Sequence, residues 1–125
     1  MRYVICSVLL LILTKSSFGQ RTTVEEYKMQ QEQRKKTEIL QQMDSGVYYM
    51  DTGDHLRADA KFRYVLENIK SVPSDLTFFF GKNSYNLALY KQTIDWITKY
   101  IQLKGTNGQY SKEAASLLKS AEAEY

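Results

Sequence analysis

The chain has 125 residues, with 17 Lys and Arg against 14 Asp and Glu, one histidine and one cysteine. We expect residues 1–19 to be removed, which deletes Arg2, Lys15 and Cys6 but no acid, so that 15 bases then face the same 14 acids. A nearly neutral chain without cysteine excludes disulfides and thiolate chemistry and lacks the basic footprint of a nucleic-acid binder. The 106 residues from 20 to 125 fit one domain.

The first twenty residues predict export. Arg2 precedes an apolar run over residues 3–13, which is shorter than the roughly 20 residues that span a bilayer. Small residues stand three positions and one position before the bond that follows Gly19, as in a bacterial-type secretory signal peptide. The alternative, an uncleaved membrane anchor, is disfavoured because Lys15 interrupts the run. We therefore expect cleavage after Gly19, a periplasmic or secreted protein, and no stable membrane insertion after cleavage.

Residues 20–37 predict a polar N-terminal helix or linker. Overlapping capping boxes at Thr22/Glu25 and Thr23/Glu26 can start a helix there. Between positions 28 and 38 only Met29 is apolar, so the segment has no stripe for a core and no heptads for a coiled coil.

Residues 38–125 predict an all-α domain of antiparallel helical hairpins. Apolar residues recur at steps of three and four from Ile39 to Met50, and Gly53 suits the end of that helix while Asp54 suits the cap of the next. The second helix should end before Pro73, after which Ser74 or Asp75 can cap the third. A fourth helix closes in the turn at 104–108, and a last helix covers about 111–124. No segment alternates with period two for long enough to form a strand.

The two hairpins superpose with an offset of 35 residues. Small residues recur where two helices approach closely, and large residues recur where the space between them is filled. The superposed pairs are Gly46 with Gly81, Tyr49 with Ser84, Gly53 with Ala88, His55 with Tyr90, Ala58 with Thr93, Phe62 with Ile97, and Val65 with Tyr100.

This pattern resembles the tetratricopeptide repeat, a helix-turn-helix unit of about 34 residues. The resemblance implies a right-handed α-solenoid with repeats at about 38–73 and 74–105 and a capping helix at 110–124. In the second repeat Thr93 and Ile97 depart from the family's small and aromatic positions, and both repeats lack the family's Trp and Leu before the first Gly. A plain helical bundle is the alternative.

The sequence predicts no catalytic residue, no metal site and no cofactor. His55 stands where the family places an aromatic that packs in the turn, so we expect a structural role for it. Asp51 and Asp54 flank Gly53 like the start of a calcium loop, but the later ligands are missing. A small hydrolase would need an isolated carboxylate pair, which we do not find.

We therefore expect a scaffold without enzymatic activity that binds a protein or peptide. In the resemblance, the first helix of each pair lines a concave groove, which implies the groove residues Leu40, Met43, Val47, Met50, Asp51, Asp75, Phe78, Lys82, Tyr85 and Asn86. Methionines at one end, and an aromatic with Lys and Asn at the other, favour a partly apolar segment that carries a polar or acidic group. Two repeats are few, so either the flanking helices complete the core or the protein self-associates. The alternative function is a structural helical oligomer of the cell envelope without a peptide groove.

Overall fold

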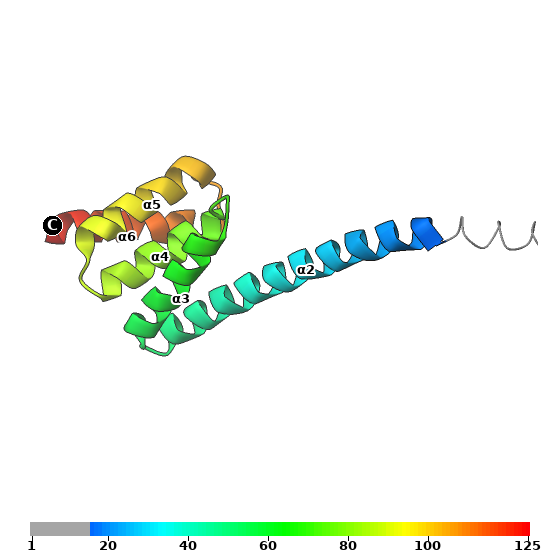
Figure 1. Ribbon diagram of the computed structural model, residues 1–125. Coiled ribbons are helices and arrows are strands. Elements are labelled where there is room, and N and C mark those ends of the chain that lie inside the picture. Colours follow the sequence, from blue (N-terminus) through cyan, green and yellow to red (C-terminus); the bar gives the residue numbers. More distant parts are fainter. Residues whose placement is uncertain (1–15) are drawn as a thin grey trace, which may run out of the picture. The chain divides into compact units, whose positions relative to one another are not determined.

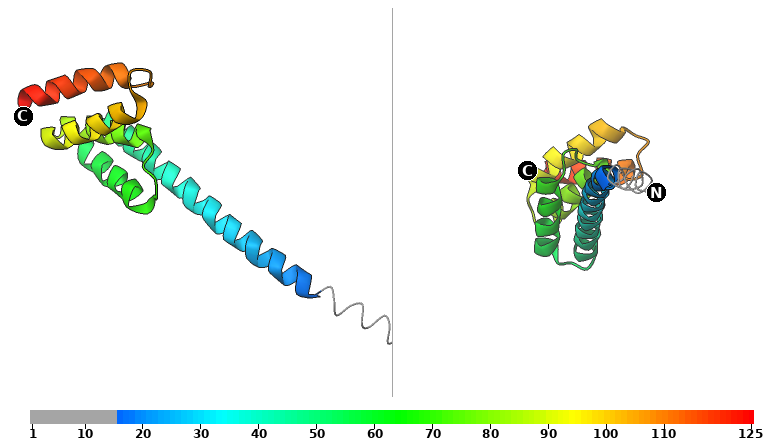
Figure 2. Two further views of the ribbon diagram at one scale, coloured as in Figure 1. Left: turned by 90° about the horizontal axis from the view of Figure 1, so that it is seen from above. Right: turned by 45° about the vertical axis from the view of Figure 1, so that its right-hand side comes forward.

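The structure is a computed structural model that describes residues 16–125, with side chains from Thr23 onward. It contains α2 (Ser16–Asp51), α3 (His55–Asn68), α4 (Ser74–Asn86), α5 (Tyr90–Lys104) and α6 (Ser111–Glu124). No residue of the described range lies in a strand, which confirms the all-α class. Helices α4, α5 and α6 lie side by side (Figure 1), and α5 and α6 run in opposite directions (Figure 2). Among the helices from residue 16 onward, none combines the length and apolarity needed to cross a bilayer.

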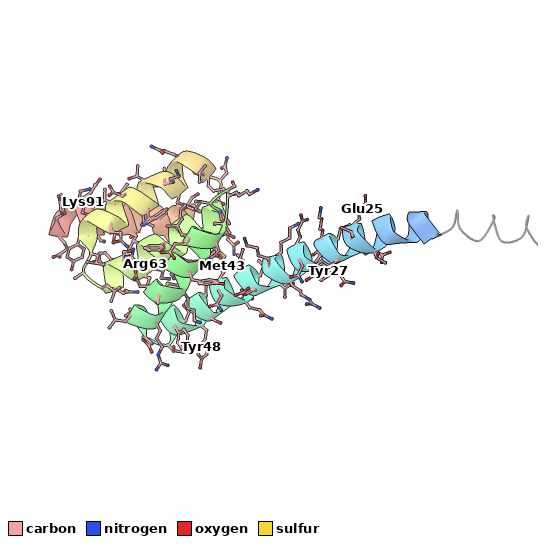
Figure 3. The ribbon with its side chains drawn as sticks, in the orientation of Figure 1. Glu25, Tyr27, Met43, Tyr48, Arg63 and Lys91 are labelled. Carbon is pink, nitrogen blue, oxygen red and sulfur yellow. The ribbon has the colours of Figure 1, made fainter. Side chains whose placement is uncertain are left out.

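The chain divides into two units, residues 1–38 and 39–125, and we call the second the helical domain. Every side chain from residue 23 to 38 is exposed, and Figure 3 shows Glu25 and Tyr27 projecting from this part of α2. Helix α2 is continuous across residue 38. The reason is local: no proline or glycine interrupts residues 20–45, and most are good helix formers. Residues 1–15 of the predicted signal peptide lie outside the described residues.

Helices α2 and α4 end in the same backbone motif. At the end of α2 the Asp54 N–H donates to the Tyr49 carbonyl (2.8 Å) and the Gly53 N–H donates to Met50 (3.3 Å). At the end of α4 the corresponding bonds run from Leu89 to Ser84 and from Ala88 to Tyr85, both 2.9 Å. These are Schellman motifs, whose pivotal residue takes a positive φ. That residue is Gly53 (φ +88°) in the first turn and Ala88 (φ +58°) in the second, as the offset of 35 residues requires.

The structure confirms one of the two predicted helix N-caps. The carboxylate of Asp54 accepts from the Arg57 N–H at 3.2 Å, which confirms it as the N-cap of α3. Helix α4 instead begins with Pro73 in the cap position and Ser74 as its first residue, without a side-chain cap bond. Proline fits there because its φ is already near the helical value and the helix requires no N–H from it.

Each hairpin closes around a glycine. A Cβ added to Gly46 would lie 2.6 Å from Cε1 of Phe62, and one added to Gly81 would lie 2.6 Å from Cδ1 of Ile97. Both large side chains are fully buried, as are Ala58 and Thr93 at the next equivalent position. The predicted close approach of small and large residues is therefore present in both hairpins at the same offset.

The core of the helical domain consists of two clusters of buried side chains. The first contains Met50, Ala58, Phe62, Val65, Leu76 and Phe80, and the second contains Phe78, Ile97, Tyr100 and Ala114. Phe79 packs against both clusters and so links them. Ala114 belongs to α6, and the Tyr100 hydroxyl accepts a 2.9 Å hydrogen bond from the N–H of Tyr110, just before α6. Helix α6 thus completes the core beside α4 and α5.

Candidate functional site

Two residues predicted to line a groove belong to the core instead. Met50 is 5% exposed in the first cluster, and Phe78 is 1% exposed in the second. The ring of Phe78 stacks on Tyr110 with 4.4 Å between centroids and lies 5.5 Å from Tyr100. The helix that follows each hairpin covers this side of α2 or α4, so both side chains are buried within the domain.

Two other predicted groove residues are half-buried by packing. Met43 packs against the first cluster, and Tyr85 makes an edge-to-face contact with Tyr90 at 5.5 Å. Figure 3 shows Met43 on the side of α2 that faces the other helices of the domain, whereas the exposed Tyr48 points away from them. Leu40, Asp51 and Asn86 are exposed, and Val47 and Lys82 are partly exposed.

The exposed and partly exposed members of the predicted groove, other than Met43 and Tyr85, lie on one stripe of each of the two helices. Positions i, i+4, i+7 and i+11 share a helix face. We call the following eight residues the α2/α4 face: Leu40, Asp44, Val47 and Asp51 on α2, and Asp75, Phe79, Lys82 and Asn86 on α4. Each α4 position is the α2 position plus 35. Sequence reasoning missed Asp44 and Phe79, although this offset and the helical period could have found both.

A pairing with α6 sets the electrostatics at one edge of this face. The ammonium of Lys82 lies 2.7 Å from Oε1 of Glu113 and 5.9 Å from the ring centroid of Phe78. Both charged side chains are partly exposed, so the pair contributes at most about 1 kcal/mol to stability. It does neutralise the one base on the face. Lys82 is therefore not available to attract the acidic group that we expected in a partner.

The hydroxyl of Tyr110 lies in an environment with an excess of negative charge at this edge of the face. Burial raises its pKa above the ordinary value. The pKa is raised further by the charges of Asp75, Tyr100 and Glu113, in that order, and is lowered by the charge of Lys82. Two carboxylates thus outweigh one ammonium near this hydroxyl. The sequence could not have located this edge, since it depends on α6 folding back along α4.

His55 has a structural environment. The side-chain amide of Asn83 donates to the His55 carbonyl at 2.9 Å, and its oxygen lies 3.2 Å from Nδ1 of His55. Asn83 is almost fully buried, so this pair joins the first hairpin to α4. In the part of the chain that the structure describes, no three His, Cys, Asp or Glu side chains are grouped to hold a metal ion.

A surface cleft of about 640 Å³ lies elsewhere, at the turn between α4 and α5. Its lining residues are Ala88, Leu89, Tyr90, Lys91, Gln92, Asp95, Trp96 and Tyr125. Nζ of Lys91 lies 3.1 Å from Oδ2 of Asp95, so the charges in the cleft neutralise each other.

Comparison with known proteins finds no match for this chain: no family model, no curated protein and no solved structure matches it.

Proposed function

We propose that this protein is an exported scaffold, related in architecture to tetratricopeptide repeats, that binds another polypeptide through the α2/α4 face and catalyses no reaction. The observation that carries the proposal is the repeated packing of two hairpins, in which Gly46 and Gly81 admit Phe62 and Ile97 at the same offset. Stacked hairpins of this kind place the first helix of each pair in one layer, which suits recognition of an extended or helical segment.

The composition of the α2/α4 face supports binding. Leu40 is 62% exposed. Val47 and Phe79 pack against the core with part of their surface and expose the rest, so each helix presents some apolar surface. The carboxylates of Asp44, Asp51 and Asp75 and the amide of Asn86 lie on the same two stripes. Protein interfaces combine apolar contacts with a polar rim in this way.

A photo-crosslinking experiment tests the face directly. The photoreactive residue p-benzoylphenylalanine replaces Leu40 in one variant and Leu56 in the other, within the full chain. Leu56 is the matched control, because it is an exposed leucine, 75% accessible, on α3. Irradiation in an extract of the source cell envelope should give a polypeptide adduct from position 40 and not from position 56.

Two results would contradict the proposal. Equal adducts from both positions, or none from position 40, would show that the face is not a specific binding surface. An adduct at position 40 that contains only this chain would favour the structural oligomer instead, and light scattering of the purified protein would then show a stable assembly.

Export is proposed separately. Expression of the full chain in a bacterium should give a processed form whose intact mass corresponds to residues 20–125 in the extracellular or periplasmic fraction. An unprocessed chain retained with the membranes would contradict cleavage after Gly19.

A further inference from the structure

Charge is distributed unevenly between the two kinds of helix in the domain. Helix α2 from residue 39 onward and helix α4 carry the acids Asp44, Asp51 and Asp75 and the single base Lys82. Helices α3 and α5, the second helix of each pair, together carry six bases and three acids: Arg57, Lys61, Arg63, Lys91, Lys99 and Lys104 against Asp59, Glu67 and Asp95. The whole domain is close to neutral, so this separation leaves the α2/α4 face acidic.

The acidity of the face is not neutralised within the described chain. Lys82 is paired with Glu113 at 2.7 Å. Within residues 23–125, no ion pair or side-chain hydrogen bond engages Asp44, Asp51 or Asp75. Two exposed carboxylates, Asp44 and Asp51, and the partly exposed Asp75 therefore remain beside the apolar side chains of the same stripes.

The spacing of these carboxylates suits a helical partner. Asp44 and Asp51 are seven residues apart on α2, which corresponds to about 10.5 Å along a helix axis at 1.5 Å per residue. Basic side chains seven residues apart on an antiparallel helix would have the same separation. Leu40 and Val47 alternate with the two acids and provide apolar contacts for the turns between them.

We propose that the occupant of the α2/α4 face is a basic amphipathic helix, in which Lys or Arg side chains seven residues apart pair with Asp44 and Asp51 while its apolar side chains contact Leu40, Val47 and Phe79. This inference rests on the proposed function and specifies the chemistry of the partner. Complementary charge of this kind gives specificity and speeds association more than it adds affinity.

Two synthetic peptides provide the test. The first is an 18-residue amidated helix of Leu, Ala and Lys with the Lys residues seven apart and an N-terminal fluorophore, and the second has Glu in place of every Lys. Fluorescence anisotropy measures the binding of each peptide to the full chain at low and at high salt. We expect the Lys peptide to bind, the Glu peptide to bind at least tenfold more weakly, and higher salt to weaken the Lys complex.

Substitutions in the protein locate the effect. An exposed ion pair contributes up to about 1 kcal/mol, so Asp44→Asn and Asp51→Asn should each weaken binding of the Lys peptide by up to about fivefold, and the two together by up to about 25-fold. Glu67→Gln on α3 is the matched control, since it removes an exposed carboxylate from another helix and should leave binding unchanged. Circular dichroism checks that each variant keeps its helix content.

The outcomes separate this inference from the proposed function. Equal binding of both peptides that is lost in a Leu40→Ser variant would overturn the basic partner and leave polypeptide binding at the face intact. Failure of both peptides to bind, together with no crosslink from position 40, would overturn both. If Glu67→Gln weakened peptide binding as much as the Asn variants do, the attraction would be nonspecific. If the protein formed a dimer without peptide, and the double Asn variant abolished that dimer, the occupant of the face would be a second copy of this chain. Both of these results contradict the inference.

Discussion

The two Schellman turns predict that opposite substitutions at equivalent positions change stability in opposite directions. Gly53 and Ala88 both hold positive φ, at +88° and +58°. A Cβ on Gly53 would meet no atom within 4 Å, so packing does not contribute to a substitution there. The conformational energy of the backbone alone should decide both effects.

The magnitude follows from two opposing terms. A left-handed conformation costs an L-residue about 1–2 kcal/mol, and replacing alanine with glycine returns about 0.4–1 kcal/mol of entropy to the unfolded chain. Ala88→Gly should therefore raise the free energy of unfolding by about 0.5–1 kcal/mol, and Gly53→Ala should lower it by a similar amount. For a domain of this size, these changes shift Tm by about 3–6 °C.

Thermal and urea unfolding followed by far-UV circular dichroism measures both changes. Ala60→Gly, at an exposed position within α3, is the matched control, because the same substitution in a helix interior should destabilise by about 1 kcal/mol. A loss of stability in Ala88→Gly comparable to that of Ala60→Gly would refute the reasoning. So would a gain of stability in Gly53→Ala.

Three further substitutions test the packing and the charged edge. Gly46→Ala should destabilise the fold by about 1–2 kcal/mol in urea melts, because overpacking against the buried Phe62 ring outweighs the gain in helix propensity, and adding Phe62→Leu should recover part of this loss. Tyr100→Phe should cost about 1–2 kcal/mol by removing the acceptor of the Tyr110 N–H, whereas Tyr27→Phe on the exposed helix should cost almost nothing; equal effects would contradict the assignment. Because the pKa of Tyr110 is raised on folding, its contribution is complete below about pH 10 and is lost as pH rises through the folded pKa. Tyr110→Phe should therefore reduce the fall of stability above pH 10, and an unchanged slope in urea melts across that range would count against this prediction.

Local patterns in the sequence determined the helices and their pairing. Apolar side chains at steps of three and four placed the helices, and the capping carboxylate of Asp54 and the break at Pro73 placed two of their limits. The offset of 35 residues identified Gly46 with Gly81 and Phe62 with Ile97 as equivalent positions, and the structure shows that each glycine meets the large side chain of its own hairpin. These features could be predicted because they depend on backbone preferences and on residues close together in the chain.

The tertiary structure alone decided which face of α2 and α4 stays exposed. Sequence reasoning could not separate Phe78 from Phe79, since neighbouring aromatics differ by only 100° around a helix and either can face the core. The position of α6 decides between them: it buries Phe78 beneath Tyr110 and brings Glu113 to Lys82. Helix α6 thus buries one predicted binding residue of α4 and pairs with the base of the α2/α4 face. It lies about thirty residues further along the chain, and such long-range packing leaves no local pattern in the sequence.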